Sequence, residues 1–211
     1  MNNEKEPPKR KRDPDKTRRL LTEAVGHILV TKGYPSFSAR EVANTAGVDK
    51  KLINYYFGSL NNLLKTYIHE KDFWMPVFRD FTVPEDPKAY IIGVLKEQFE
   101  YFLQHKDMQR FIHWQISEYH PVISSVSMMR ESEIERILEM CRGRFKGSPV
   151  NLNAVIAILA AGIYCIVLQN NTGNGPVCGI DISRETHRRV LMQAIEQILG
   201  WAWEAAGLKP G

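Results

Sequence analysis

The chain has 211 residues, of which 44% are hydrophobic and 25% are charged, a composition typical of a soluble globular protein with one large or two small domains. Its three cysteines, Cys141, Cys165 and Cys178, lack the CxxC spacing of a zinc site and are too few for a disulfide framework, which fits a reducing cytoplasm. The net charge of +4 is uneven: residues 1–72 hold 14 Lys and Arg against 9 Asp and Glu, and the remainder holds 14 against 15.

Residues 1–14 are polar and proline-rich, and we expect them to form a disordered basic tail. The run Lys9-Arg10-Lys11-Arg12 suits either a DNA minor groove or a solvated tail that aids solubility, and the sequence favours neither. No apolar segment follows these charges, which argues against a signal peptide.

A helix is predicted from near Asp15 to Lys32, followed by two short helices within residues 38–57. Ser38 is a typical N-cap with an acid three residues later, and Gly47 suits the left-handed conformation that ends a helix. Asp49 caps the next helix in the same way. Two capped helices around a tight turn form a helix-turn-helix, whose second helix lies in a DNA major groove.

The exposed face of that second helix carries groups that suit DNA. Lys50 and Lys51 can attract phosphates, Asn54 can pair with an adenine edge, and Tyr55 can donate to a phosphate. A small helical hairpin with a solvated lysine face is the alternative interpretation.

Residues 16–67 resemble the DNA-binding domain of TetR-family transcriptional repressors. The resemblance rests on Lys32-Gly33-Tyr34, on residues 38–50, and above all on the block Asn54-Tyr55-Tyr56-Phe57-Gly58-Ser59. It implies DNA contacts by Ser38, Arg40, Lys50, Lys51, Asn54, Tyr55, Tyr56 and Ser59. Two positions depart from the family pattern: Lys51 replaces a small residue, and Leu60 replaces a lysine expected to contact phosphate.

Beyond the helix-turn-helix we expect helices throughout, about nine in all, and therefore an all-α fold. The predicted domains are a DNA-binding domain at 15–60 and a helical ligand-binding and dimerisation domain at 61–211. The expected later helices start near residues 59, 86, 107, 121, 151 and 183.

Residues 154–168 are apolar without interruption, yet they are shorter than the roughly 20 residues that span a bilayer, so we predict no membrane segment. A helix that is apolar on all sides is expected to be buried all round. We interpret this helix and the last one as half of a four-helix bundle in a homodimer, as the resemblance also implies; a buried monomer core is the alternative. The expected interface residues are Ala157, Ala160, Ala161, Ile195 and Leu199.

Aromatic and methionine side chains in the middle helices can line a pocket for a small-molecule effector, although each is also a plausible core residue. The candidates are Trp74, Phe99, Phe102, Phe111, Trp114 and Met128. His105, His113 and His120 lack the spacing of a helical metal site, and no catalytic constellation is present, so we predict no metal, no cofactor and no enzymatic activity.

The sequence therefore predicts a cytoplasmic, ligand-responsive transcriptional regulator, most simply a repressor released from a palindromic operator when an effector binds. The alternative is a helical protein–protein adaptor whose helix-turn-helix is structural only.

Overall fold

The computed structural model describes residues 13–71, 84–171, 173 and 175–207. Within these residues the chain forms nine α-helices and a short 3-10 helix, and the sole strand-like feature is an isolated bridge between Val177 and Ile180. The all-α prediction is confirmed. The chain divides into two compact units, Met1–Lys71 and Asp72–Gly211.

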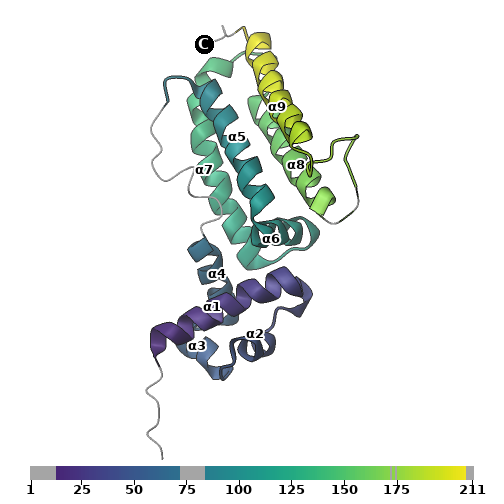
Figure 1. The fold of residues 1–211 in the computed structure, drawn as a ribbon. Helices are drawn as coiled ribbons and strands as arrows, with labels where there is room; N and C mark the ends of the chain where they lie inside the picture. Colours follow the sequence, from purple (N-terminus) through teal and green to yellow (C-terminus); the bar gives the residue numbers. More distant parts are fainter. Residues whose placement is uncertain (1–12, 72–83, 172, 174, 208–211) are drawn as a thin grey trace, which may run out of the picture. The chain divides into compact units, whose positions relative to one another are not determined.

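The first unit holds α1 to α4, coloured purple to blue in Figure 1. Their bounds are α1 Pro14–Thr31, the 3-10 turn Tyr34–Ser36, α2 Ala39–Ala46, α3 Lys51–Phe57 and α4 Leu60–Lys71. α1 packs against α2 and α4, and α3 packs against α4. Their apolar faces form one core, in which Leu21, Val25, Ile28, Val42, Leu63 and Leu64 are completely buried.

The boundaries of these helices follow from their capping residues. The Asp13 carboxylate accepts from the amides of Asp15 and Lys16, with Pro14 in the first turn of α1. The predicted domain boundary after residue 60 falls at the start of α4. Because α4 packs against α1 and α3, the first unit continues to Lys71.

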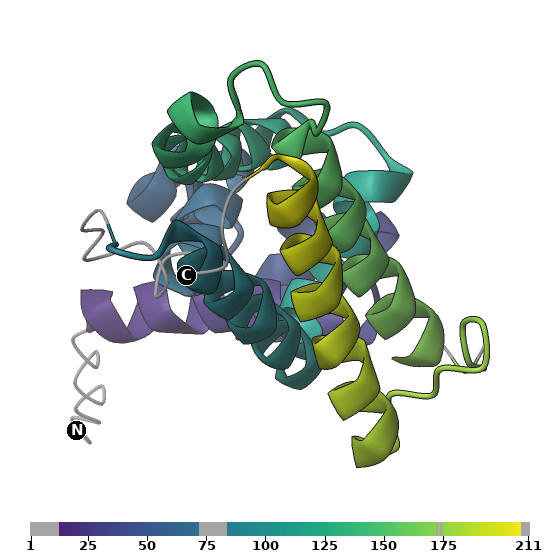
Figure 2. The same ribbon diagram turned by 90° about the horizontal axis from the view of Figure 1, so that it is seen from above.

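The second unit consists of α5 to α9 (Figures 1 and 2). Their bounds are α5 Pro87–Gln104, α6 Lys106–Ser117, α7 Pro121–Phe145, α8 Leu152–Asn171 and α9 Glu185–Ala205. α5 packs against the four other helices of the unit and so forms its centre. The Asp86 carboxylate caps α5 by accepting from the amides of Lys88 and Ala89.

The expectation that α8 would be buried all round is wrong for a single protomer. Leu159, Ile163 and Val167 are buried, whereas Ala157, Ala161 and Ile158 on the opposite face are exposed, Ile158 to 73%. A helix sequence that is apolar on all sides does not show how many neighbouring helices the same chain packs against it. Here the other helices of the second unit cover only one side of α8. By length and composition alone α8 could also cross a membrane, with a mean hydropathy of 2.2.

Candidate functional site

The turn between α2 and α3 is built from hydrogen bonds that the sequence allows at these positions. Ser38 Oγ accepts from the Glu41 amide at 3.2 Å, and Gly47 ends α2 with a left-handed φ of 64°. Asp49 Oδ1 accepts from the Lys51 amide at 2.8 Å and so caps α3. An ion pair between Lys32 and Glu41 ties the end of α1 to α2. The helix-turn-helix is therefore fixed at both of its helix starts.

The residues predicted to contact DNA lie on the surface of the first unit. Arg40, Lys50, Lys51, Asn54 and Tyr55 are exposed, and we call these five residues the recognition surface. Ile53 on the opposite face of α3 is buried. The α3 backbone is thus anchored through Ile53, while Tyr55, 79% exposed, projects its ring into solvent.

The remaining predicted contacts are partly occupied by the fold itself. Ser38 and Ser59 are helix caps, with Ser59 Oγ accepting from the Asn62 amide at 3.1 Å. Each hydroxyl can still donate its proton, which is what a phosphate oxygen requires. Tyr56 is half-buried, and its ring packs edge-on against the Tyr55 ring with centroids 4.9 Å apart.

Arg18 lies beside the recognition surface, and sequence reasoning missed it. Its guanidinium carbon lies 5.5 Å from the centre of the Tyr56 ring and 5.3 Å from that of Phe57. Such cation–π contacts hold the two rings in place and bring a positive charge beside α3. Nothing in the local sequence near Arg18 indicates this role, because the contact joins α1 to α3 across the fold.

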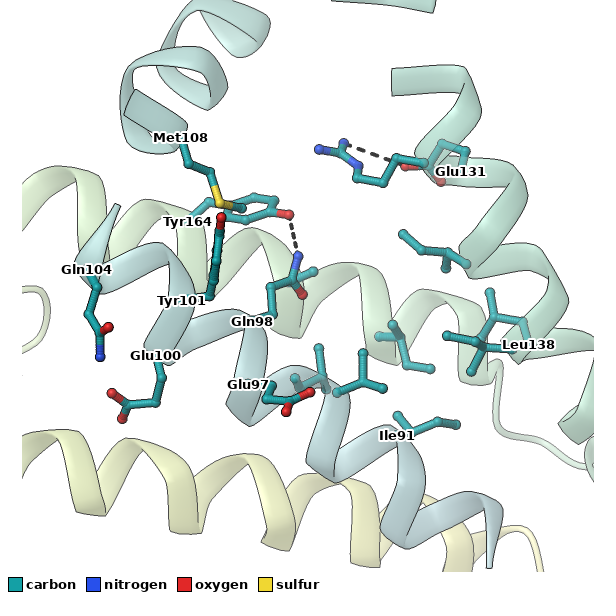
Figure 3. Close-up of a pocket in the computed structure, with 17 residues that line it drawn as sticks. Ile91, Glu97, Gln98, Glu100, Tyr101, Gln104, Met108, Glu131, Leu138 and Tyr164 are labelled. Atoms are coloured by element: carbon teal, nitrogen blue, oxygen red, sulfur yellow. Dashed lines mark hydrogen bonds and ion pairs between the residues drawn. The ribbon is translucent and has the colours of Figure 1, made fainter. Parts of the chain in front are cut away.

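A cavity of about 360 Å³ lies within the second unit, between α5, α6, α7 and α8 (Figure 3). Aliphatic side chains form a large part of its wall: Ile91, Val94, Leu95, Ile134, Ile137, Leu138, Ile156 and Ala160. Among the polar residues of the wall, Gln98 and Tyr164 form a hydrogen bond, in which the Tyr164 hydroxyl oxygen accepts from Gln98 Nε2 at 2.5 Å. Burial raises the pKa of Tyr164 above its usual value, so the hydroxyl stays protonated at neutral pH.

The aromatic residues predicted to line a pocket do not line this cavity. Phe99, Phe102, Phe111 and Trp114 are buried core residues, and Phe102 packs edge-on behind the Tyr164 ring. Met128 is 64% exposed on α7, and Trp74 lies outside the described residues. Helical spacing identified these side chains as apolar, but the aromatic residues that line the cavity are Tyr101 and Tyr164, beside the aliphatic residues of its wall.

The predicted dimer residues separate into three groups. Ala157 and Ala161 are exposed on α8, whereas Ile195 and Leu199 are 2% and 0% exposed and belong to the protomer core, which corrects their assignment to an interface. Ala160 lines the cavity. On α9 the stripe that stays exposed is a neighbouring one, with Val190, Ile198 and Trp201.

Comparison with known proteins gives a consistent picture. Residues 21–66 match the family model of bacterial regulatory proteins of the tetR family, whereas the comparison with curated proteins gave no match. A TetR-family transcription regulator from Marinobacter aquaeolei VT8 is 17% identical with a TM-score of 0.59, covering 90% of this chain and 95% of its own.

Two further solved structures have the same fold. The transcriptional regulator FadR from Bacillus subtilis, in complex with stearoyl-CoA, is 13% identical with a TM-score of 0.61, covering 86% of this chain and 96% of its own. A TetR-like regulator from Rhodococcus sp. RHA1 is 14% identical with a TM-score of 0.59, covering 92% and 97%. The chain therefore carries the N-terminal domain of the tetR-family regulators at residues 21–66 and has the TetR-family fold.

Proposed function

We propose that this protein is a homodimeric, ligand-responsive DNA-binding regulator of transcription, and that it represses by occupying a palindromic operator. The observation that carries the proposal is the exposed recognition surface on a doubly capped helix-turn-helix. A protein that works by binding DNA and a small molecule needs no catalytic group, so we propose no enzymatic activity. We also propose that the protein acts in the cytoplasm.

The proposed roles on DNA follow from side-chain chemistry. Lys50, Lys51 and Tyr55 contact phosphates and set the position of α3, whereas Asn54 reads a base edge in the major groove. Arg18 holds the Tyr56 ring and adds positive charge at the same place. Each phosphate neutralised releases counterions, so affinity should fall steeply with added salt.

The proposed dimer uses the exposed apolar stripes of α8 and α9, which we call the α8–α9 face: Ala157, Ile158, Ala161, Cys165, Val190, Ile198 and Trp201. Side chains as large as Ile158 and Trp201 gain free energy when they leave water, and the alanines let a partner helix approach closely. Two-fold symmetry would place two α3 helices about 34–36 Å apart, one turn of DNA, which is why we propose a palindromic site.

The cavity in the second unit is the proposed effector site. Its volume lies within the usual range for small-molecule sites, and the FadR structure of the same fold holds stearoyl-CoA. An effector releases the operator if it binds more tightly to the conformation with low DNA affinity. Coupling of about 1–3 kcal/mol is typical of such proteins.

Selection of binding sites from random duplex DNA, followed by fluorescence anisotropy on the selected site, tests the DNA assignment. We expect Asn54→Ala to relax base preference at particular positions and Lys50→Ala to weaken all sequences alike, with a smaller salt dependence. Glu196→Gln, on the surface of the second unit, is the control that should change neither property. Affinity that is insensitive to salt would refute the phosphate contacts.

The dimer is tested by sedimentation equilibrium of Ile158→Asp and Trp201→Asp. Each introduces a charge into the proposed interface, so both should shift the protein toward monomer. Ile116→Asp is the matched control, since Ile116 is 65% exposed on α6, outside the α8–α9 face. A wild-type monomer at micromolar concentration would refute this part of the proposal and favour the α8–α9 face as a docking site for another protein.

A further inference from the structure

The two ends of the cavity differ in chemistry, and this difference indicates the class of its ligand. In Figure 3, Gln98, Tyr101, Met108 and Tyr164 lie together at one end, and Ile91 and Leu138 lie toward the other. An amphiphile with an apolar chain and a polar head matches such a cavity. The inference rests on the proposed role of the cavity as an effector site.

Arg130 on α7 brings a positive charge to the wall of this cavity. Its side chain is 8% exposed, Nη1 donates to Gln115 Oε1 at 3.3 Å, and Nη2 lies 3.8 Å from Glu131 Oε1. A guanidinium removed from water is costly unless an anion accompanies it. At 3.8 Å from Nη2, the Glu131 carboxylate is beyond ordinary hydrogen-bond distance, so the two groups form an ion pair without a direct hydrogen bond.

Glu131 is placed so that a ligand can replace it. Its side chain is 67% exposed, and its carboxylate can therefore turn into solvent at little cost. A ligand carboxylate that takes its place can form the short, two-pronged hydrogen bonds that arginine makes with carboxylates. The exchange keeps Arg130 neutralised and improves its hydrogen bonding.

We propose that the cavity binds an amphiphile with an apolar chain and a free carboxylate head, which displaces Glu131 from Arg130 and accepts a hydrogen bond from Tyr164. Gln98 already donates to the Tyr164 oxygen, which leaves the hydroxyl proton for the ligand. The chain then lies along the aliphatic wall, where each buried methylene contributes about 0.8 kcal/mol in transfer from water.

Two other carboxylates line the cavity, and their negative charges must be compared with the positive charge of Arg130 to predict the charge of the ligand head. Glu97 and Glu100 on α5 are exposed, so water and salt screen their charges. Arg130 is nearly buried, and a charge in a medium of lower dielectric constant acts more strongly on its neighbours. The buried charge therefore favours an anionic head over a cationic one.

Isothermal titration calorimetry on the full chain, without DNA, tests the proposal with matched probes below their micelle concentrations. The probes are dodecanoate, dodecanol, dodecylamine and dodecanoyl-CoA, which share a chain and differ in the head. We expect dodecanoate to bind roughly ten- to a hundredfold more tightly than dodecanol, because its hydrogen bonds involve a charged partner. Equal affinities, or tighter binding of dodecylamine or dodecanoyl-CoA, would overturn the proposal.

Variants identify the anchor. Arg130→Gln should abolish the preference for dodecanoate while dodecanol binding persists, and Glu131→Gln should raise dodecanoate affinity because the competing carboxylate is gone. Arg136→Gln is the control on the same helix, with a side chain 58% exposed and outside the cavity wall. If circular dichroism shows that Arg130→Gln does not fold, the Glu131→Gln variant tests the proposal by itself. An unchanged or lower affinity of Glu131→Gln for dodecanoate would refute the displacement of Glu131 by the ligand.

The calorimetry is independent of DNA binding. If the protein prefers dodecanoate over the other probes but binds no DNA, the proposed function alone is refuted. DNA binding without any preference for dodecanoate would refute this inference alone.

Discussion

Replacement of Gly26 by alanine should disturb the packing of α1 on α4. A Cβ atom at Gly26 would lie 2.9 Å from both Cε2 and Oη of Tyr67 and 3.1 Å from its Cζ, closer than carbon atoms normally approach. Tyr67 is 3% exposed, so its ring has little room to move. Overpacking of this kind costs about 1–3 kcal/mol.

A second effect opposes the first. Alanine is favoured over glycine within a helix by about 1 kcal/mol. We therefore expect Gly26→Ala to destabilise the protein by roughly 0–2 kcal/mol, the difference between the two effects. Gly143→Ala on α7 is the matched control: apart from the adjacent residues and the local helix backbone, no atom lies within 4 Å of its added Cβ, so helix propensity dominates and stability should rise.

Urea denaturation of the two variants measures this contrast. The variant Tyr67→Leu, combined with Gly26→Ala in a double-mutant cycle, isolates the contact, because the smaller side chain makes room for the new methyl group. We expect the double variant to be less destabilised than the sum of the two single variants, because Gly26→Ala no longer overpacks against the smaller side chain. If Gly26→Ala stabilises the protein as much as Gly143→Ala does, the reasoning about close packing between α1 and α4 is refuted.

Three further changes test other parts of the structure. Ser38→Ala removes the α2 cap and should lower the free energy of unfolding by about 1 kcal/mol, with weaker DNA binding; Ser38→Asp, which keeps an acceptor, should retain the stability, and equal stability of Ser38→Ala and wild type would contradict the cap. Lys32→Ala removes an ion pair whose partners are 49% and 28% exposed, so urea denaturation should show a loss below about 1 kcal/mol, and a larger loss would mean that the pair is less hydrated than its exposure indicates. Iodoacetamide should modify the exposed Cys178 quickly and the buried Cys141 slowly, because burial raises the pKa of the Cys141 thiol. Mass spectrometry should show that Cys165 is protected in the dimer but reacts in the Ile158→Asp variant. Rapid modification of Cys165 in the wild-type protein would argue against the α8–α9 face as the dimer interface.

Local sequence signals were sufficient to predict where the helices of the helix-turn-helix begin and end. The caps at Ser38 and Asp49 and the glycine at position 47 act through hydrogen bonds and backbone conformations within a few residues, so they are readable without knowledge of the fold. The same holds for the exposed face of α3, because Ile53 fixes which side of a short helix is buried.

The cavity, the protomer core and the exposed face were decided by tertiary packing. Phe99 and Met128 are both apolar residues on helices, yet one is fully buried and the other is 64% exposed, because neighbouring helices cover one position and not the other. Likewise Leu199 is buried and Ile198 beside it is partly exposed. Periodicity identifies which residues share a helix face, but only the arrangement of all five helices determines whether that face meets a core, a cavity or water.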